Sequence, residues 1–373
     1  MKVAIAFLGN IQYDTRARNF HDSLIARGHD VRFIGYDWDT IGFKPIQTDT
    51  VSVRSLRLAY RLKLFYASFT IRTFFSLITG KMDVLIASDF FALPVCVLIA
   101  KLKKARLFYD SREIYTELTS LNGKPWLKKL YGLVEKQCVR STHTIFTTGE
   151  MDTEILKAKY PFARITEMHN YPQKEEIVCP KEIRQHFPEL DHPTILIYQG
   201  VLAPGLGIET TFKAMRELEN CALVLLGEGA YFQHYQTLAQ KIGIRKRTWF
   251  AGRVSQNELL AYTAACDIGL SVIDNISGNC YYALPNKLFA YLMAGLPVIV
   301  TDLPQMKKVV ETYQVGACVP DQDFEAIVRV VREWRADPER FRFLKKNCKA
   351  ASEIFHWERE FDTHASLFEK RDD

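Results

Sequence analysis

Short apolar runs rich in β-branched and aromatic residues alternate with segments of helical period along almost the whole chain. Such alternation is typical of parallel sheets, because two parallel strands can be joined only by a crossover, which is usually a helix. We therefore expect the α/β class, with doubly wound Rossmann-like sheets. The predicted strands are 2–8, 30–36, 82–88, 105–110, 143–148, 194–200, 221–229, 248–252, 267–273, 296–301 and 315–320.

The length of the chain predicts two domains. At 373 residues it exceeds the size at which a single hydrophobic core stops growing. The polar, proline-marked segment 171–193 separates the two series of strands, and we expect it to hold a linker and the first helix of the second domain. The expected boundaries are 1–172 for the first domain, 173–352 for the second and 353–373 for a closing helix.

Charge and cysteine spacing exclude several classes of protein. The net charge of +6 suits anionic small molecules or a membrane surface without requiring a nucleic acid, and we expect no nucleic-acid partner. The eight cysteines have neither zinc-site nor disulfide spacing, which fits a reducing cytoplasm. The start of the chain lacks the apolar core of a signal peptide, and no apolar run is long enough to span a bilayer.

Segment 54–81 carries six basic residues and no acidic one, interleaved with Leu, Phe and Tyr. One interpretation is a pair of amphipathic surface helices that contact anionic lipid head groups, and the other is a domain helix with a solvated basic face. Segment 101–131 adds basic and aromatic residues to the same half of the chain, which favours contact with an anionic membrane.

Glycines follow three strands of the second series, where ligands of doubly wound sheets bind. They occur in "YQGVLAPGLGIE", "LLGEGA" and "FAGRV". Glycine lets the backbone approach a ligand closely, but ordinary strand-to-helix turns use it too. The chain has no P-loop, and no G-x-G-x-x-G follows the first strand of either half, which argues against a dehydrogenase.

The stretch "YYALPNKLFAYLMAGLPVIV", residues 281–300, predicts a helix whose first turn binds an anion. Pro285 is placed to begin the helix and Gly295 to end it. Free backbone N–H groups and the helix dipole make such an N-terminus an anion site, and Lys287 adds a full charge beside Asn286. A lysine in a helix is often a snorkelling surface residue, but apolar neighbours surround this one, so we expect it to bind a pyrophosphate.

The order of these motifs, ending in "ALPNKLF" and "AGLPVI", resembles the donor domain of retaining nucleotide-sugar glycosyltransferases with the GT-B fold, the group 1 or family 4-like enzymes. In the first half, "DTRARNFHDSLIARGHDV" and "YDSREIYTEL" resemble their N-terminal strand-loop-helix and acceptor loop. The resemblance spans nearly the whole chain. It implies two Rossmann-like domains that face a central cleft, with a C-terminal helix that crosses back to the first domain.

The resemblance also implies roles for individual residues. Lys287 would bind the donor diphosphate, and together with Asp110, Arg112 and Glu113 in the acceptor loop it forms the expected catalytic set. For Arg112, an ion pair with Asp110 or Glu113 is an equally good interpretation. The remaining donor-binding residues would be Gly9, Asn10, Gly200, Gly205, Leu206, Gly207, Glu209, Gly227, Glu228, Gly229, Arg253, Tyr281, Tyr282, Ala283, Leu284, Pro285, Asn286 and Ala290.

Three positions depart from the family pattern. Tyr282 and Ala290 stand where members commonly carry a pair of acids, and Leu206 stands where a basic residue usually contacts the diphosphate. The alternative to an active enzyme is therefore an impaired pseudo-glycosyltransferase that acts as a binding partner or scaffold. A sugar epimerase on the same fold would need histidines near the sugar, and the nine histidines do not cluster at such a loop.

The expected function is transfer of a hexosyl group from a nucleotide-diphosphate sugar to a saccharide or lipid-linked acceptor, with retention of anomeric configuration. The expected setting is synthesis of bacterial-type surface polysaccharide or glycoconjugate, in the cytoplasm or at the inner face of its membrane. We expect no metal and no cofactor, because lysine and a helix end would neutralise the phosphates and no D-x-D carboxylate pair is placed to hold Mg²⁺.

Overall fold

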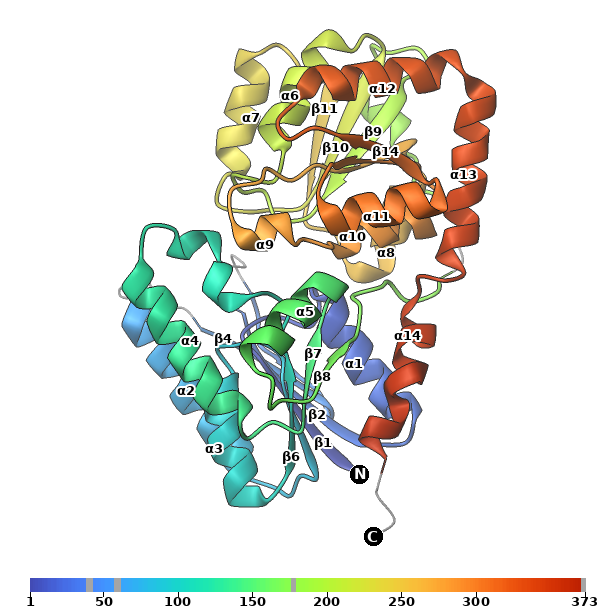
Figure 1. The fold of residues 1–373 in the computed structure, drawn as a ribbon. Helices are drawn as coiled ribbons and strands as arrows, with labels where there is room; N and C mark the ends of the chain where they lie inside the picture. Colours follow the sequence, from blue (N-terminus) through green and yellow to red (C-terminus); the bar gives the residue numbers. More distant parts are fainter. Residues whose placement is uncertain (38–42, 57–61, 176–178, 370–373) are drawn as a thin grey trace. The chain divides into compact units, whose positions relative to one another are not determined.

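The structure is a computed structural model, and it describes residues 1–37, 43–56, 62–175 and 179–369. These residues form two compact units (Figure 1). Unit 1 consists of Met1–Asn170 with Glu358–Asp373, and unit 2 consists of Tyr171–Trp357. The chain therefore passes between the units twice, after Asn170 and after Trp357.

Unit 1 is built on an eight-stranded sheet in the order β3-β4-β2-β1-β5-β6-β7-β8. All neighbouring strands are parallel except β3 and β4. The order reverses between β1 and β5, so this sheet is doubly wound. The strands are β1 (Lys2–Phe7), β2 (Asp30–Asp37), β3 (Ile46–Gln47), β4 (Val51–Ser55), β5 (Val84–Ala87), β6 (Arg106–Asp110), β7 (Thr144–Thr147) and β8 (Ile165–Glu167).

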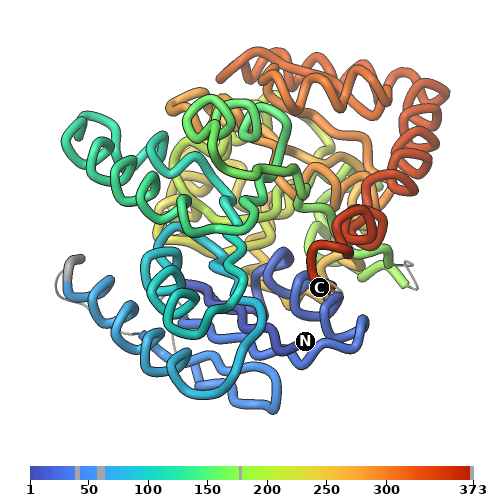
Figure 2. The backbone as a smooth tube through the Cα atoms, turned by 60° about the horizontal axis from the view of Figure 1, so that its bottom comes forward, coloured from blue at the N-terminus to red at the C-terminus, as the bar shows by residue number. Residues whose placement is uncertain are grey.

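Helices cover both faces of this sheet. Two views show α2, α3 and α4 side by side on one face, with α1 and α14 on the other (Figures 1 and 2). Buried apolar residues of the first group, such as Phe69, Ile99 and Val139, share one core with the strands. The helices are α1 (Thr15–Ala26), α2 (Leu62–Ile78), α3 (Leu93–Lys103), α4 (Pro125–Val139), α5 (Glu150–Lys159) and α14 (Trp357–His364), with the 3-10 turns η1 (Tyr115–Glu117), η2 (Thr119–Leu121) and η5 (Ala365–Phe368).

The end of the chain completes unit 1. Phe361 of α14 and Phe368 of η5 form an aromatic cluster with Phe20 of α1 and with Phe108 and Phe146 of the sheet, at centroid separations between 5.0 and 6.4 Å. Aromatic pairs at this spacing pack favourably beyond the area they bury. The closing helix thus returns to the first domain, as the sequence predicts.

Unit 2 contains a six-stranded parallel sheet in the order β11-β10-β9-β12-β13-β14. This is the Rossmann order, whose switch point lies between its first and fourth strands, here β9 and β12. The strands are β9 (Thr194–Gln199), β10 (Cys221–Leu226), β11 (Thr248–Gly252), β12 (Ile268–Ser271), β13 (Val298–Thr301) and β14 (Gly316–Val319).

The helices of unit 2 form two groups, and each group packs on one face of the sheet through its own apolar core. Residues of α6, α7 and α12 pack on one face of the sheet, and residues of α10, α11 and the end of α13 pack on the other. The helices are α6 (Ile208–Glu217), α7 (Phe232–Lys241), α8 (Gln256–Ala264), α9 (Gly278–Tyr281), α10 (Asn286–Met293), α11 (Pro304–Tyr313), α12 (Phe324–Ala336) and α13 (Pro338–Ser352), with the 3-10 turns η3 (Arg184–His186) and η4 (Arg245–Arg247).

Two local predictions are wrong. Segment 54–81 is not a helix pair in the described residues. It begins in strand β4, residues 57–61 lie outside the described residues, and the single helix α2 follows them. In the described part of 171–193 there is only the short 3-10 turn η3 and no α-helix. Strands β3, β4 and β8 are not among the predicted strands, and each is short or lies near an edge of the sheet.

Candidate functional site

The loops that follow β9 and β12 pack directly on each other at the switch point of unit 2. Gly207 has φ +69°, and a Cβ there would lie 2.5 Å from the carbonyl oxygen of Val272. Asp274 N–H donates to the carbonyl of Gly205 at 3.0 Å. This is the crevice in which doubly wound sheets bind their ligands.

Tyr291 of α10 bridges the two strands where they diverge. Its hydroxyl donates to the Leu270 carbonyl at 3.1 Å and accepts from Gln199 N–H at 3.0 Å. Its ring packs against Gly269, where a Cβ would lie only 2.3 Å from the ring. Tyr291 therefore replaces a missing ladder bond and fixes α10 against the end of β9. In the sequence, Tyr291 stands out only as an apolar neighbour of Lys287.

Helix α10 begins as the sequence predicts. Pro285 is its N-cap residue, no side chain caps it, and Gly295 lies just past its end with φ +72°. The first-turn amides of Asn286 and Lys287 have no partner in the described part of the chain. The positive end of the helix dipole is therefore available to an anion.

Lys287 places its ammonium group beside these amides. The residue is 8% exposed, and Nζ lies 3.9 Å from the ring centroid of Tyr198 and close to Gly200. Among residues 1–37, 43–56, 62–175 and 179–369, no carboxylate lies within ion-pair distance of Nζ. Burial lowers the pKa of Lys287 to about 7. A cation that is desolvated without a counter-ion is poised to pair with an incoming anion.

The glycines of the neighbouring loops have structural reasons of their own. Gly227 has φ +147°, and a Cβ there would lie 1.9 Å from the Gly200 carbonyl oxygen. A Cβ on Gly229 would lie 2.4 Å from the Leu202 carbonyl oxygen. The close packing of the loops after β9 and β10 thus explains both glycines, so their presence alone does not indicate a ligand.

The other residues predicted to bind the donor lie around these loops. Glu228 forms an ion pair with Arg253, whose Nε lies 3.9 Å from Oε2, and Glu209 is exposed in the first turn of α6. Leu206 packs on the apolar core of unit 2. Tyr281, Tyr282, Ala283, Leu284 and Ala290 are half-buried or exposed, and Gln305 donates to the carbonyl of Tyr282.

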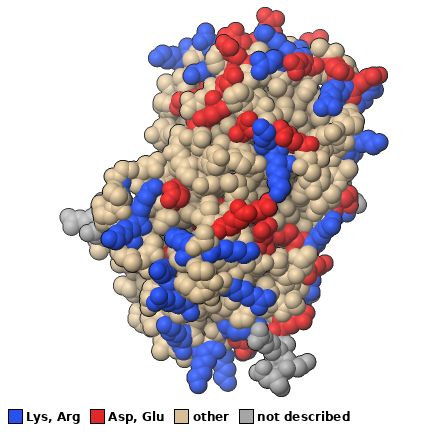
Figure 3. Space-filling view, in the orientation of Figure 1, with Lys and Arg blue, Asp and Glu red and all other residues tan. Residues whose placement is uncertain are grey.

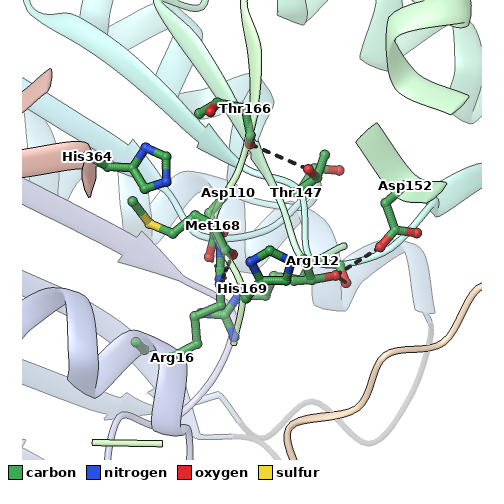
Figure 4. A network of polar contacts seen from close by, with 12 residues as sticks. Arg16, Asp110, Arg112, Thr147, Asp152, Thr166, Met168, His169 and His364 are labelled. Atoms are coloured by element: carbon green, nitrogen blue, oxygen red, sulfur yellow. Dashed lines mark hydrogen bonds and ion pairs between the residues drawn. The ribbon is translucent and has the colours of Figure 1, made fainter. Parts of the chain in front are cut away.

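Asp110 in unit 1 is fully buried between two arginines (Figure 4). Its Oδ1 accepts from Arg16 Nε at 2.8 Å, and its Oδ2 accepts from Arg112 Nε at 3.0 Å. Arg16 also donates to the Met168 carbonyl at 2.6 Å, which ties α1 to β6 and to the residue after β8. The expectation that Asp110 faces the sugar and acceptor is therefore corrected, because its 0% exposure leaves no oxygen for a ligand.

Arg112 adopts the ion-pair arrangement that the sequence left open. It pairs with Asp110, and its Nη1 donates to Asp14 Oδ2 at 2.6 Å. Burial alone would lower the pKa of Arg112, but the carboxylates of Asp14 and Asp110 raise it. Its guanidinium lies 4.2 Å from the centroid of the Phe7 ring. These contacts indicate that Arg112 holds the loop after β1 against the loop after β6, a connection that requires Asp14 and that the sequence does not reveal.

The remaining predicted residues of unit 1 differ in accessibility. Asn10 is 8% exposed, and its amide donates to Asp37 while its oxygen accepts from Gln12 N–H. Gly9 precedes it in the same loop. Glu113 is exposed after β6. Its neighbour Asp152 is buried and accepts from Thr148 at 3.1 Å, and burial raises the pKa of Asp152 to about 7.

The described residues contain no cluster of three histidine, cysteine or acidic side chains that could hold a metal ion. Within the same residues, no helix combines the length and apolarity that crossing a bilayer requires.

His169 and His364 both lie near Glu360 of α14, within unit 1. His169 Nδ1 lies 3.0 Å and His364 Nε2 lies 3.9 Å from Glu360 Oε1. This histidine pair anchors the C-terminal segment.

Comparison with known proteins identifies relatives for both halves. The sequence model of the family described as glycosyl transferases group 1 matches residues 180–351, and that of the glycosyl transferase 4-like domain matches residues 13–170. A GDP-mannose-dependent alpha-(1-6)-phosphatidylinositol monomannoside mannosyltransferase of Mycobacterium tuberculosis is 25% identical over 164 residues. That match covers 43% of this chain and 42% of the relative, so it spans less than half of either.

Solved structures resemble the whole chain. Sucrose-phosphate synthase from Thermosynechococcus elongatus superposes with a TM-score of 0.79 at 17% identity, covering 99% of this chain and 98% of that one. HepE from Anabaena, in complex with UDP-glucose, gives a TM-score of 0.75 at 13% identity and covers 99% of both chains. The two family matches together cover most of the chain and show that it belongs to the group 1 glycosyltransferases, and the solved structures show that it has the GT-B fold.

Proposed function

We propose that this protein transfers a hexosyl group from a nucleotide-diphosphate sugar to a saccharide or lipid-linked acceptor with retention of anomeric configuration. The observation that carries the proposal is the buried, unpaired ammonium of Lys287 beside the free amides of α10. Among common metabolites, a diphosphate supplies both the charge and the several acceptor oxygens that this arrangement lacks.

The same arrangement suits the leaving group of the reaction. As the bond between the sugar C1 and the diphosphate oxygen breaks, negative charge grows on the diphosphate, and Lys287 and the α10 amides stabilise it. The acceptor hydroxyl forms its bond to C1 on the same face and gives its proton to the departing phosphate oxygen. Retention then needs no protein nucleophile, and the protein contributes positioning and electrostatic stabilisation.

The proposed reaction is independent of metal and cofactor, because the lysine and the helix terminus neutralise the diphosphate. We place it in synthesis of a bacterial-type surface polysaccharide or glycoconjugate, in the cytoplasm. The mycobacterial relative is named for a phosphatidylinositol monomannoside, which is a lipid, and this supports a lipid-linked acceptor for this chain.

The test is calorimetric titration of the purified protein with UDP, GDP, dTDP and ADP. We expect saturable binding of one nucleotide, which identifies the donor base. Incubation of the matching radiolabelled nucleotide sugars with saccharide and lipid-linked acceptors then identifies the acceptor, and NMR of the product reports the anomeric configuration. Absence of binding by all four nucleotides, or a product with inverted configuration, would refute the proposal.

Restoring the family's charged residues is expected to raise turnover. Leu206 lies in the loop after β9, and Ala290 lies on the same helix as Lys287. Leu206→Arg and Ala290→Glu therefore place charged side chains on the loop and the helix that are proposed to bind the donor. Each charged hydrogen bond is worth ~1.5–3 kcal/mol, so kcat/KM should rise by roughly tenfold or more for each change that reaches the donor. Steady-state kinetics measures this, with Leu238→Arg on α7 as the control. Activity that appears only in the double variant would instead support the impaired alternative.

A further inference from the structure

Helices α2, α3 and α4 each present a row of apolar side chains to solvent. The rows are Leu64, Ile71 and Phe75 on α2, Leu98 and Leu102 on α3, and Trp126, Leu130 and Leu133 on α4, with exposed fractions between 46% and 67%. Their spacings of three, four, seven or eleven residues place the members of each row on one side of its helix. Exposed apolar patches of this kind mark interaction sites.

The three rows belong to one continuous surface, which we call the apolar face. Helix α3 packs between α2 and α4, and the three run side by side over the same face of the unit 1 sheet (Figures 1 and 2). Lys103 joins α3 to the end of α2, because its Nζ donates to the carbonyls of Ile78 and Gly80 at 2.5 and 3.0 Å. The rows therefore lie on a single rigid support.

The exposed charges on α2, α3 and α4 themselves have one sign. The only acidic residue in the sequences of α2, α3 and α4 is Glu135, and it is 1% exposed. Its carboxylate accepts from the hydroxyls of Tyr109 and Tyr160 and pairs with Lys159 at 2.8 Å, all within unit 1. Glu135 is thus neutralised internally and contributes little to the surface.

The basic residues of these helices remain on the surface. Lys101, Lys129 and Lys136 are exposed, have no ion pair in the described part of the chain, and flank the apolar rows at three-residue spacing. Figure 3 shows blue atoms gathered over the lower part of the view, where unit 1 is seen. Glu117 of η1 is 39% exposed and pairs with Lys128 of α4 at 3.1 Å, so it offsets that lysine and leaves Lys101, Lys129 and Lys136. A surface that combines apolar rows with these unpaired lysines is complementary to anionic lipid.

We propose that the apolar face is a membrane-docking surface that binds the anionic phospholipid leaflet, with the leucines and Trp126 inserted at the level of the head groups and the lysines on lipid phosphates. Tryptophan and leucine favour that depth, and lysine side chains reach the phosphates from it. A second copy of the chain fits less well, because a two-fold interface would place the same unpaired lysines opposite one another.

This surface goes beyond the proposed function and does not depend on it. All three helices belong to unit 1, whereas Lys287 and the donor loops belong to unit 2. Changes on the apolar face should therefore leave nucleotide binding intact, and changes at Lys287 should leave lipid binding intact.

The experiment is co-sedimentation of the full chain with sucrose-loaded vesicles, either phosphatidylethanolamine with phosphatidylglycerol or phosphatidylcholine alone. We expect strong binding to the anionic vesicles only. The triple variant Trp126→Ser, Leu130→Ser, Leu133→Ser should bind at least tenfold more weakly. Each of Lys101→Ala, Lys129→Ala and Lys136→Ala should weaken binding by about fivefold at low salt.

The matched control is Phe343→Ser with Ile354→Ser, two exposed apolar residues of unit 2, which should bind vesicles as the unaltered chain does. Nucleotide titration of every variant checks that unit 2 is intact, and circular dichroism checks the fold. Equal binding to both vesicle types, or no loss in the triple variant, overturns the proposal. A dimer in sedimentation velocity that the triple variant converts to a monomer assigns the face to self-association instead.

Discussion

Replacing Lys287 with methionine should weaken nucleotide-diphosphate binding by roughly a hundredfold or more and, at the same time, stabilise the ligand-free protein. The loss of affinity follows from removing a charge-assisted contact with phosphate in a desolvated position, worth roughly 3 kcal/mol. The gain in stability follows because burial of the ammonium without a carboxylate is unfavourable, and burial holds its pKa at about 7. Methionine has a similar shape and carries no charge.

The stabilisation has a defined pH dependence. The folded pKa of Lys287 is about 7, below the ordinary value of 10.5, so between these values the unfolded chain binds more protons. The stability of the unaltered protein should therefore rise as the pH is raised from about 7 toward 10, and the charged side chain is most destabilising below pH 7. The advantage of Lys287→Met, roughly 2–4 kcal/mol, should be full below pH 7 and shrink above it.

Calorimetry measures the affinity and urea unfolding at several pH values measures the stability. Lys241→Met, at the exposed end of α7, is the matched control and should change neither. Unchanged nucleotide affinity in Lys287→Met would remove Lys287 from the donor site.

Replacing Asp110 with alanine should lower the free energy of unfolding by roughly 3–5 kcal/mol. The carboxylate is fully buried and bonded to both Arg16 and Arg112, so its removal leaves a buried guanidinium, that of Arg16, without a counter-charge. In the variant, Arg112 retains its ion pair with Asp14, whereas Arg16 retains its hydrogen bond to the Met168 carbonyl and no carboxylate. The loss should therefore loosen α1 from the sheet.

Urea unfolding of Asp110→Ala measures this effect, with Glu189→Ala as the control. Glu189 pairs with Lys246 at 2.7 Å and both side chains are exposed, so its loss should cost less than about 1 kcal/mol. A variant Asp110→Ala that keeps full stability but loses glycosyl transfer would restore the catalytic role and contradict the structural one.

Sequence pattern predicts the strands and the donor helix of this chain well because each has a local cause. The apolar runs of the two sheets are bounded by polar turns, and Pro285 and Gly295 delimit α10 by their own backbone preferences. The burial of Lys287 follows from its apolar neighbours. Strand β4 is missed because its polar residues Ser52 and Arg54 interrupt the expected run.

Other parts of the site depend on which distant groups meet, which spacing does not encode. Asp110 is buried at the end of β6, where it contacts Arg16 of α1, which is far away in sequence, and no local signal marks that pairing. Gly227 and Gly229 looked like ligand contacts because a packed loop and a binding loop use the same residue type. Tyr291 bridges two strands through its hydroxyl, although its position in an apolar segment predicts only that it is buried.

The discontinuity of unit 1 has a consequence for biosynthesis. The aromatic cluster around Phe20, Phe108 and Phe146 is completed by Phe361 and Phe368, which the ribosome adds only after all of unit 2. At about 5–20 residues per second, the nascent chain waits roughly 10–40 s with that surface uncovered. Unit 1 can therefore complete its core only after the whole of unit 2 has been synthesised.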